Sequence, residues 1–210
     1  GSIGHIGCWS FCQDKIMTTG GEGGMVTTND ESLWRKMWAY KDHGKSYEAV
    51  FERDHPEGFK WLHESFGTNW RMTEMQAAVG KVQLGRLTKI IMENKKRYDV
   101  IKKNMPKSIK NRLVPSGSSP IYDTLIFFTN SKEKKDNYVS ILNEYGFGTK
   151  NLPDAMEWHC TAFWDHALDK EQTVRSEKTR ELLNKAIAIP IWLRKTPEEY
   201  LKLSKVLFNI

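Results

Sequence analysis

The sequence predicts an α/β protein, because three features of its pattern point to that class. Short apolar or aromatic stretches of strand length recur along the chain, and stretches with apolar residues at helical spacing lie between them. Gly, Pro, Asn and Asp residues separate the two kinds of stretch, as turn residues do. Hydrophobic residues make up 39% and charged residues 28% of the chain, so the composition is that of a globular protein with a core.

The first part of the chain is expected to hold two short strands and a helix. Residues 6–11 are apolar and aromatic, as in a buried strand, and residues 25–28 form a second such stretch. Asp30 is suited to cap a helix over residues 31–41. The apolar face of that helix would consist of Leu33, Trp34, Met37 and Trp38. Residues 42–67 show no period and are expected to form a long loop.

A long helix and a small α/β unit are expected to follow. Thr73 would cap a helix that runs to about Lys103, because Pro106 cannot continue it. After a Gly/Ser/Pro loop at residues 115–120, we expect strands over 121–129 and 186–191 and helices over 132–145, 172–184 and 196–208. We place the domain boundary near residue 105, which gives one domain over residues 1–105 and another over 106–210.

Composition and charge limit the classes of function. The net charge of +6 admits nucleic acid, an anionic membrane surface or a phosphorylated small molecule as a partner. Lys and Arg are interspersed with Asp and Glu, and the densest positive runs fall in expected helices, which favours solvated helix faces. Three Cys, an odd number, indicate reduced thiols and a cytoplasmic protein. No stretch approaches the roughly 18 apolar residues of a membrane span, and no signal peptide is visible.

The densest chemical signal lies between the first two expected strands. Ser10 lies near the end of the first expected strand, Lys15 follows five residues later, and four glycines surround Glu22 before the second strand. Glycines permit tight turns, and Ser hydroxyls and loop N–H groups suit a phosphate. A lysine beside such a loop can hold a phosphate or act as a Schiff-base amine. The order of residues excludes a P-loop. On spacing alone, a surface turn with an ordinary lysine remains open.

Residues 10–24, Ser-Phe-Cys-Gln-Asp-Lys-Ile-Met-Thr-Thr-Gly-Gly-Glu-Gly-Gly, resemble the cofactor-lysine segment of the DegT/DnrJ/StrS aminotransferases, which act on nucleotide-linked keto sugars. This chain has one glycine more than the family pattern, and we expect the loop to tolerate it. The resemblance implies that Lys15 binds pyridoxal 5'-phosphate (PLP) as a Schiff base and that Ser10 binds its phosphate. The released lysine could then move a proton between substrate and cofactor carbons. One side branch of the family, which performs dehydration, has His in place of this lysine, and Lys15 argues against it.

A second segment agrees with the first. Residues 67–78, which begin Gly-Thr-Asn-Trp-Arg-Met, are similar to the Gly-x-Asn-x-Arg-Met pattern of the family at the start of a long helix. The resemblance implies that Asn69 reaches the cofactor phosphate in the other subunit of a homodimer. A turn residue at the helix entry remains an alternative for Asn69. Arg71 is either an anion contact or part of a structural salt bridge.

Weaker matches extend the resemblance along the chain. His43, in Asp-His-Gly after the first helix, and His159 would line the substrate pocket, although a structural role explains each as well. Residues 188–191 and 196–199 resemble the last strand and helix of the family. The implied fold is aspartate-aminotransferase-like, with residues 1–105 as the later part of the PLP-binding large domain and its long connecting helix, and 106–210 as the small C-terminal α/β domain.

The implied activity is transfer of an amino group, with glutamate as the expected donor, to a keto group of a nucleotide-linked deoxysugar. The product would enter a cell-surface polysaccharide or a glycosylated metabolite. In the family, the Asp that pairs with the pyridine nitrogen and the aromatic residue that stacks on the ring lie further upstream than the 14 residues before Lys15. We therefore expect the activity to belong to a longer chain and these 210 residues alone to be inactive. A family member with a regulatory or non-sugar role remains an alternative.

The sequence does not predict a metal site or a nucleic-acid interface. His5, Cys8 and Cys12 could suggest a metal site, but only His159 and Cys160 could complete it, and zinc sites usually show compact cysteine pairs.

Basic charge together with Trp70, Trp158 and Trp164 could suggest stacking on nucleic acid. The sequence contains no recognised nucleic-acid-binding motif, so this class is not expected either.

Overall fold

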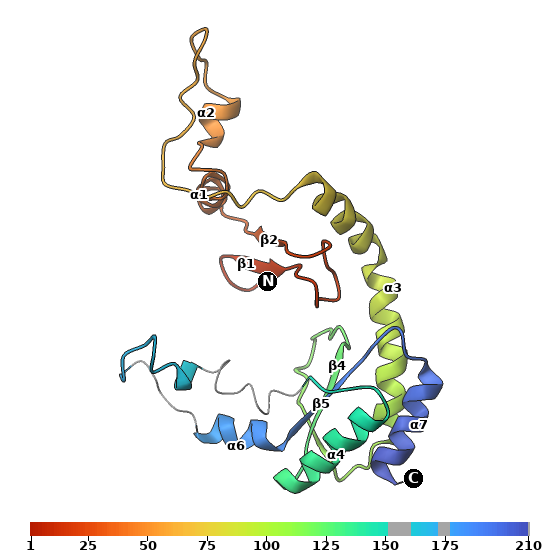
Figure 1. Cartoon of the computed structure of the whole chain (residues 1–210). Helices are drawn as coiled ribbons and strands as arrows, with labels where there is room; N and C mark the ends of the chain where they lie inside the picture. The colour runs from red at the N-terminus through yellow and green to blue at the C-terminus, as the bar shows by residue number, and fades with distance from the viewer. Residues whose placement is uncertain (151–160, 172–176, 210) are drawn as a thin grey trace. The chain divides into compact units, whose positions relative to one another are not determined.

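The computed structural model describes residues 1–150, 161–171 and 177–209 of the chain (Figure 1). The chain forms two compact units, Gly1–Leu87 and Thr88–Ile210. Each unit contains both helices and strands, which confirms the predicted α/β class. Of the helices in the described part of the chain, none combines the length and apolarity needed to cross a membrane.

The first unit begins with a small antiparallel sheet. Strand β1 (Gly7–Ser10) pairs with β2 (Gly24–Thr27), and the register places Ser10 opposite Gly24 and Gly7 opposite Thr27. Both strands were expected, and each boundary lies within one residue of the prediction. The pairing brings the two ends of the glycine-rich segment together, so residues 11–23 form a loop closed by the sheet.

Helix α1 (Glu31–Lys41) has the bounds that the sequence predicts. Asp30 caps it, because its side chain accepts a hydrogen bond of 3.0 Å from the Leu33 N–H. Three of the four expected apolar residues, Leu33, Met37 and Trp38, are half-buried, and Trp34 is exposed.

The prediction of a long loop after α1 is wrong at one point, because the segment contains the short helix α2 (Tyr47–Phe51). Ser46 caps α2 with a bond of 3.2 Å from the Ala49 N–H. The ring of Tyr47 packs edge-on against those of Trp34 and Trp38, at centroid distances of 5.0 and 5.3 Å. A helix of five residues is too short to show a period. Tertiary contact between aromatic rings therefore stabilises it.

Helix α3 (Glu74–Asn104) is the long helix that the sequence predicts. Thr73 and Gln76 cap its start reciprocally. The Gln76 N–H donates to the Thr73 hydroxyl at 3.3 Å, and the Thr73 N–H donates to the Gln76 side-chain oxygen at 3.1 Å. The helix ends two residues before Pro106, as expected.

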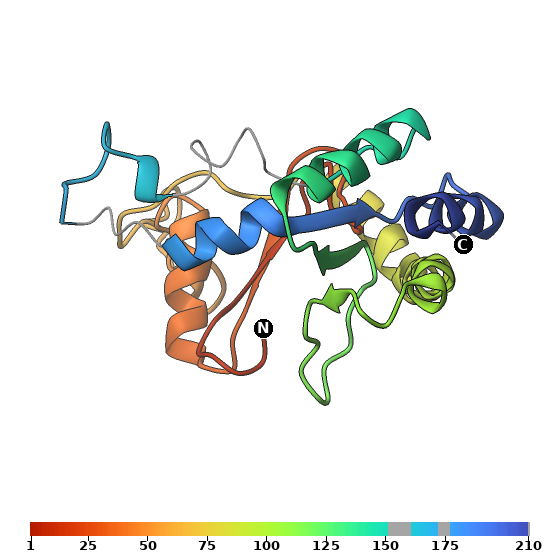
Figure 2. The same cartoon turned by 90° about the horizontal axis from the view of Figure 1, so that it is seen from below.

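The second unit is built on a three-stranded antiparallel sheet in the order β3-β4-β5. Its elements are β3 (Lys110–Asn111), β4 (Thr124–Phe128), α4 (Lys132–Glu144), a 3-10 helix (Thr161–Phe163), α6 (Glu177–Lys185), β5 (Ala186–Pro190) and α7 (Pro197–Phe208). Figure 2 shows α4 running alongside β5, into which α6 leads directly. Strand β3 was not expected, because two residues carry no strand pattern. The expected helix over 172–184 corresponds to α6, and residues 172–176 lie outside the described part.

The core of the second unit lies between the sheet and its helices. Its buried members are Ile101, Met105, Leu125, Phe127, Leu142, Phe147, Ile187, Ile189, Ile191, Tyr200, Leu203, Leu207 and Phe208. The second unit includes the part of α3 that follows Leu87, and Ile101 in that part belongs to this core. The division of the chain into a large domain before residue 105 and a small domain after it stays a prediction.

Candidate active site

The lysine loop is closed at its neck by the backbone. Phe11 donates its N–H to the Gly23 carbonyl at 2.8 Å, and Thr19 donates its N–H to the Phe11 carbonyl at 3.1 Å. Lys15 follows a turn in which its own N–H donates to the Cys12 carbonyl at 3.1 Å. The backbone around Lys15 is therefore held in place by loop and strand hydrogen bonds.

The side chain of Lys15 is accessible. It is 49% exposed, and its ammonium lies 3.8 Å from the Asp14 carboxylate, which is a weak surface ion pair. An exposed amine on a fixed backbone can bind an aldehyde, and the weak pair with Asp14 is easily given up. Ser10 is also exposed, and its hydroxyl accepts a long hydrogen bond of 3.4 Å from the Cys12 N–H. That bond uses an oxygen lone pair, so the hydroxyl proton stays available to an anion.

The loop accommodates its additional glycine as a bulge. Gly20 and Gly21 have φ angles of 83° and 150°, which glycine adopts freely. A Cβ at either position would meet nothing within 4 Å, so their role is conformational. Across the bulge, the Thr19 hydroxyl donates to the Glu22 carbonyl at 3.0 Å. The bulge therefore leaves the closed frame of the loop intact.

A second cluster forms where the chain enters α3. Asn69 pairs with Asp42 in an isolated antiparallel bridge, and the Arg71 Nε donates to Asn69 Oδ1 at 3.0 Å. Asp42 is 8% exposed, and its Oδ1 lies 3.3 Å from Lys45 Nζ and 3.5 Å from Arg71 Nη1. Burial alone would raise the pKa of Asp42, but the Lys45 ammonium and the Arg71 guanidinium together lower that pKa below its ordinary value.

Arg71 makes the contacts of a structural residue in this chain, and its role as an anion contact stays a prediction. The guanidinium makes a structural salt bridge with Asp42, and it also orients the amide of Asn69. Because the amide oxygen accepts from Arg71, the Asn69 NH2 group is directed away from the guanidinium and can donate to an anion. Both side chains are exposed.

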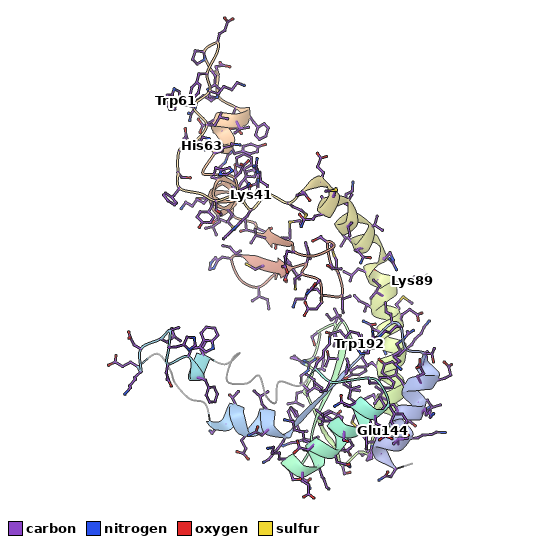
Figure 3. The ribbon with its side chains drawn as sticks, in the orientation of Figure 1. Lys41, Trp61, His63, Lys89, Glu144 and Trp192 are labelled. Atoms are coloured by element: carbon purple, nitrogen blue, oxygen red, sulfur yellow. The ribbon has the colours of Figure 1, made fainter. Side chains whose placement is uncertain are left out.

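His43 holds the same region through its backbone. Its φ is 58°, in the left-handed region that is uncommon for residues other than glycine. Its N–H donates to the Thr68 carbonyl at 3.0 Å, and its carbonyl lies 3.0 Å from Nδ1 of His63. Figure 3 shows His63 on the extended segment that follows α2. The imidazole of His43 is exposed, so a role in a substrate pocket stays a prediction.

Some of the expected residues cannot be placed. His159, Cys160 and Trp158 lie outside the described residues. Cys8 and Cys12 are free thiols. Over the ranges that the structure describes, no group of three or more His, Cys, Asp and Glu side chains could hold a metal ion.

Sequence reasoning did not single out Asp42, Thr19 or Gln76. Asp42 stood inside the Asp-His-Gly match, but its burial could not be read from that match. Thr19 is 2% exposed, and Gln76 makes contacts 54 residues away in sequence. A Gln three residues after a capping Thr does indicate a helix start. That spacing does not indicate the hydrogen bond between Gln76 and the Glu22 carbonyl.

An accessible lysine amine on a loop held by backbone hydrogen bonds, with a serine hydroxyl at the start of that loop that can donate to a phosphate, suits the chemistry of PLP. That combination on an α/β fold is typical of PLP-dependent aminotransferases. The model of the DegT/DnrJ/EryC1/StrS aminotransferase family matches residues 1–207, and the chain belongs to this family. Aminotransferases of this family are PLP-dependent.

Individual relatives agree with the family match. The chain is 35% identical over 105 residues to GDP-perosamine synthase of Escherichia coli O157:H7, which covers 50% of this chain and 26% of that protein. It is 43% identical over 89 residues to the spore coat polysaccharide biosynthesis protein SpsC of Bacillus subtilis, which covers 41% of this chain and 22% of that protein.

Similarity to a solved structure confirms the fold. An aminotransferase from Psychrobacter cryohalolentis superimposes with a TM-score of 0.80 at 36% identity, over 99% of this chain and 56% of that one. The expected aspartate-aminotransferase-like fold is thereby confirmed. The chain spans about half the length of the solved structures that it matches.

Proposed function

We propose that the protein containing this chain transfers an amino group from an amino-acid donor, glutamate, to a keto group of a nucleotide-linked deoxysugar. The observation that carries the proposal is the accessible Lys15 on a closed glycine-rich loop, in a chain that belongs to a family of aminotransferases. The names of the relatives, one a GDP-perosamine synthase and one a polysaccharide biosynthesis protein, support a nucleotide-sugar substrate and a role in polysaccharide or glycosylated-metabolite synthesis.

The residues take distinct roles in this proposal. Lys15 would hold PLP through its side-chain amine, and the same amine, when free, would move the proton at the substrate carbon. Ser10 donates its hydroxyl proton to the cofactor phosphate. The cofactor supplies an electron sink when bound. His43 and His159 are proposed to line the substrate pocket.

Asn69 is proposed to serve the phosphate of a second subunit in a homodimer, with Arg71 holding its amide. The exposed aromatic side chains of the first unit support association. Phe66 is 92% and Trp61 is 76% exposed, and Figure 3 shows Trp61 on the segment after α2. Apolar side chains exposed to this degree are candidates for an interface, which would cover them. A cytoplasmic location is proposed from the free thiols Cys8 and Cys12.

The test uses the longer protein that contains this chain. PLP is added, the visible absorbance of the cofactor is recorded, and borohydride reduction followed by peptide mass mapping locates the adduct. A reduced pyridoxyl group on the peptide containing Lys15 is expected. An adduct on another lysine, or none, would mean that Lys15 is not the cofactor lysine. Sedimentation of the same sample should give a dimer, and a monomer at working concentration would overturn the proposed role of Asn69.

A further inference from the structure

The lysine loop and the start of α3 are joined by one side chain. Gln76 lies in the first turn of α3, and its Nε2 donates to the Glu22 carbonyl at 2.7 Å. Glu22 belongs to the loop that carries Lys15, whereas Asn69 and Arg71 lie in the segment that precedes α3. The bond therefore connects the two segments that contain the candidate site residues, 54 residues apart in sequence.

The Glu22 carbonyl is also bound from within the loop. It accepts the Thr19 hydroxyl at 3.0 Å, and the Thr19 N–H donates to the Phe11 carbonyl at the neck of the loop. Thr19 is 2% exposed, although it lies on a loop of a unit with few buried side chains. The Gln76 bond thus reaches a part of the loop that is also held by hydrogen bonds within the loop.

One turn further along α3, the helix also packs closely against the lysine loop. Gly80, four residues after Gln76, lies on the same helix face. A Cβ at Gly80 would be 2.9 Å from Cγ2 of Thr19, so the helix approaches the loop closely where glycine leaves room. On the loop side, a Cβ at Gly23 would meet Thr19 Oγ1 at 2.2 Å and Met72 Cε at 3.3 Å. A hydrogen bond and close packing therefore act on the same face of α3.

Both the oxygen and the nitrogen of the Gln76 side-chain amide make hydrogen bonds. Its oxygen accepts from the Thr73 N–H at 3.1 Å and from the Thr73 hydroxyl at 3.0 Å, while its nitrogen binds the loop. A rotated amide would present the wrong group to both partners. The cap of α3 therefore orients the group that holds the loop.

We propose that Gln76 is a positioning residue, which fixes the Lys15 loop against the segment that carries Asn69 and Arg71. The effect of Gln76 on catalysis rests on the proposed function, whereas the contact between Gln76 and the loop does not depend on it. Loss of the Gln76 bond would let the loop, and Lys15 with it, move relative to the start of α3.

Two substitutions separate positioning from helix capping. Gln76→Glu keeps an acceptor oxygen for Thr73 but places a second carboxylate oxygen, without a proton, against the Glu22 carbonyl. Thr73→Ala removes the capping hydroxyl but keeps the backbone N–H of residue 73, which still holds the Gln76 amide oxygen, so the bond between Gln76 and Glu22 remains. If Gln76 acts only as a cap, Thr73→Ala should have the larger effect. If it positions the loop, Gln76→Glu should.

Both variants are made in the longer protein and measured first without PLP. Hydrogen–deuterium exchange of the Thr19 amide is expected to rise about fivefold in Gln76→Glu, as for the loss of one net hydrogen bond, and to stay within about twofold of the wild type in Thr73→Ala. The dissociation constant for PLP should rise by a similar factor in Gln76→Glu alone. The position of the borohydride adduct is then mapped in the wild type.

The outcomes distinguish the two proposals. Unchanged exchange at Thr19 in Gln76→Glu, or equal changes in both variants, overturns the positioning role whatever the cofactor does. Faster exchange in Gln76→Glu alone, with an adduct on Lys15 and weaker PLP binding, supports it. If exchange is faster in Gln76→Glu but the wild type shows no adduct on Lys15, the contact between Gln76 and the loop is supported and the proposed function is refuted. Gln76 would then have no role in catalysis.

Discussion

Arg71 donates its Nε–H to Asn69 Oδ1 at 3.0 Å while its Nη1 lies 3.5 Å from the buried Asp42. The guanidinium thereby connects a buried carboxylate to an exposed amide. Asp42 holds Arg71, and Arg71 decides which end of the Asn69 amide faces outward. The segment before α3 thus presents an NH2 group in a defined direction, which is what binding of a phosphate requires.

Asn69→Asp should separate cofactor binding from stability. The carboxylate can still accept from Arg71, but it offers no donor and brings a negative charge toward a phosphate. PLP binding to the longer protein should weaken about tenfold or more, because hydrogen bonds to charged groups contribute about 1.5–3 kcal/mol. The melting temperature without PLP should not fall. Equal PLP affinity in titrations of wild type and variant would refute a phosphate role for Asn69.

Asp42 should make the stability of the first unit sensitive to acid. Its folded-state pKa is lowered, so its contribution is complete above the unfolded value of about 3.9 and is lost as the pH falls through the folded value. The free energy of unfolding should therefore drop below about pH 4. Asp42→Asn should be less stable near neutral pH and should lose this part of the acid dependence. Parallel pH profiles for both proteins would contradict the prediction.

Gly44→Ala should be strongly destabilising, and Gly58→Ala provides its matched control. Both glycines have positive φ, 76° and 98°. A Cβ at Gly44 would lie 1.7 Å from the Ser65 carbonyl oxygen, whereas one at Gly58 would meet nothing within 4 Å. Gly58→Ala should cost about 1 kcal/mol of backbone strain, and Gly44→Ala about 3 kcal/mol or more, since the backbone must also move. Equal unfolding midpoints in urea would show that the clash is relieved without cost.

Thr196→Ala should destabilise the second unit by about 1 kcal/mol. Thr196 caps α7, and its hydroxyl accepts from the Glu199 N–H at 3.2 Å while the Glu199 carboxylate accepts from the Thr196 N–H at 2.7 Å. Thr196→Ser keeps the hydroxyl and should retain most of the stability. The comparison is made by urea denaturation, and a Ser variant as unstable as the Ala variant would assign the effect to the lost methyl group.

Ionisation of Tyr200 should lower the free energy of unfolding of the second unit at alkaline pH. Burial raises the pKa of Tyr200 to about 12. Its hydroxyl donates to the Pro190 carbonyl at 3.0 Å and accepts from the Trp192 N–H at 2.7 Å. Since the folded pKa exceeds the unfolded value of about 10, stability is complete below about pH 10 and is lost as the pH rises toward 12, by about 2–3 kcal/mol.

Tyr200→Phe provides the control for that profile. It should cost about 1–3 kcal/mol at neutral pH, because it leaves the Pro190 carbonyl and the Trp192 N–H without their partner. It should also remove this alkaline decrease. An absorbance titration of tyrosinate in which every tyrosine ionises near pH 10 in the folded protein would contradict the prediction.

Much of the fold could be predicted where short-range rules decide. The bounds of α1 follow from Asp30 and the helical spacing after it, and α3 follows from Thr73 and ends before Pro106. Helix α2 and strand β3 were missed, since five and two residues are too few to show a period. The lysine segment was identified through its local pattern of Ser, Lys and Gly.

The sequence by itself determined the family, the α/β class and the candidate lysine, because these depend on residues close together in the chain. Tertiary structure alone decided that Asp42 is buried under Lys45 and Arg71, that Arg71 orients Asn69, and that Gln76 holds the lysine loop. These relations join residues as many as 54 positions apart. Burial and hydrogen-bond geometry at such separations arise from the packing of elements, which no local pattern of side chains encodes.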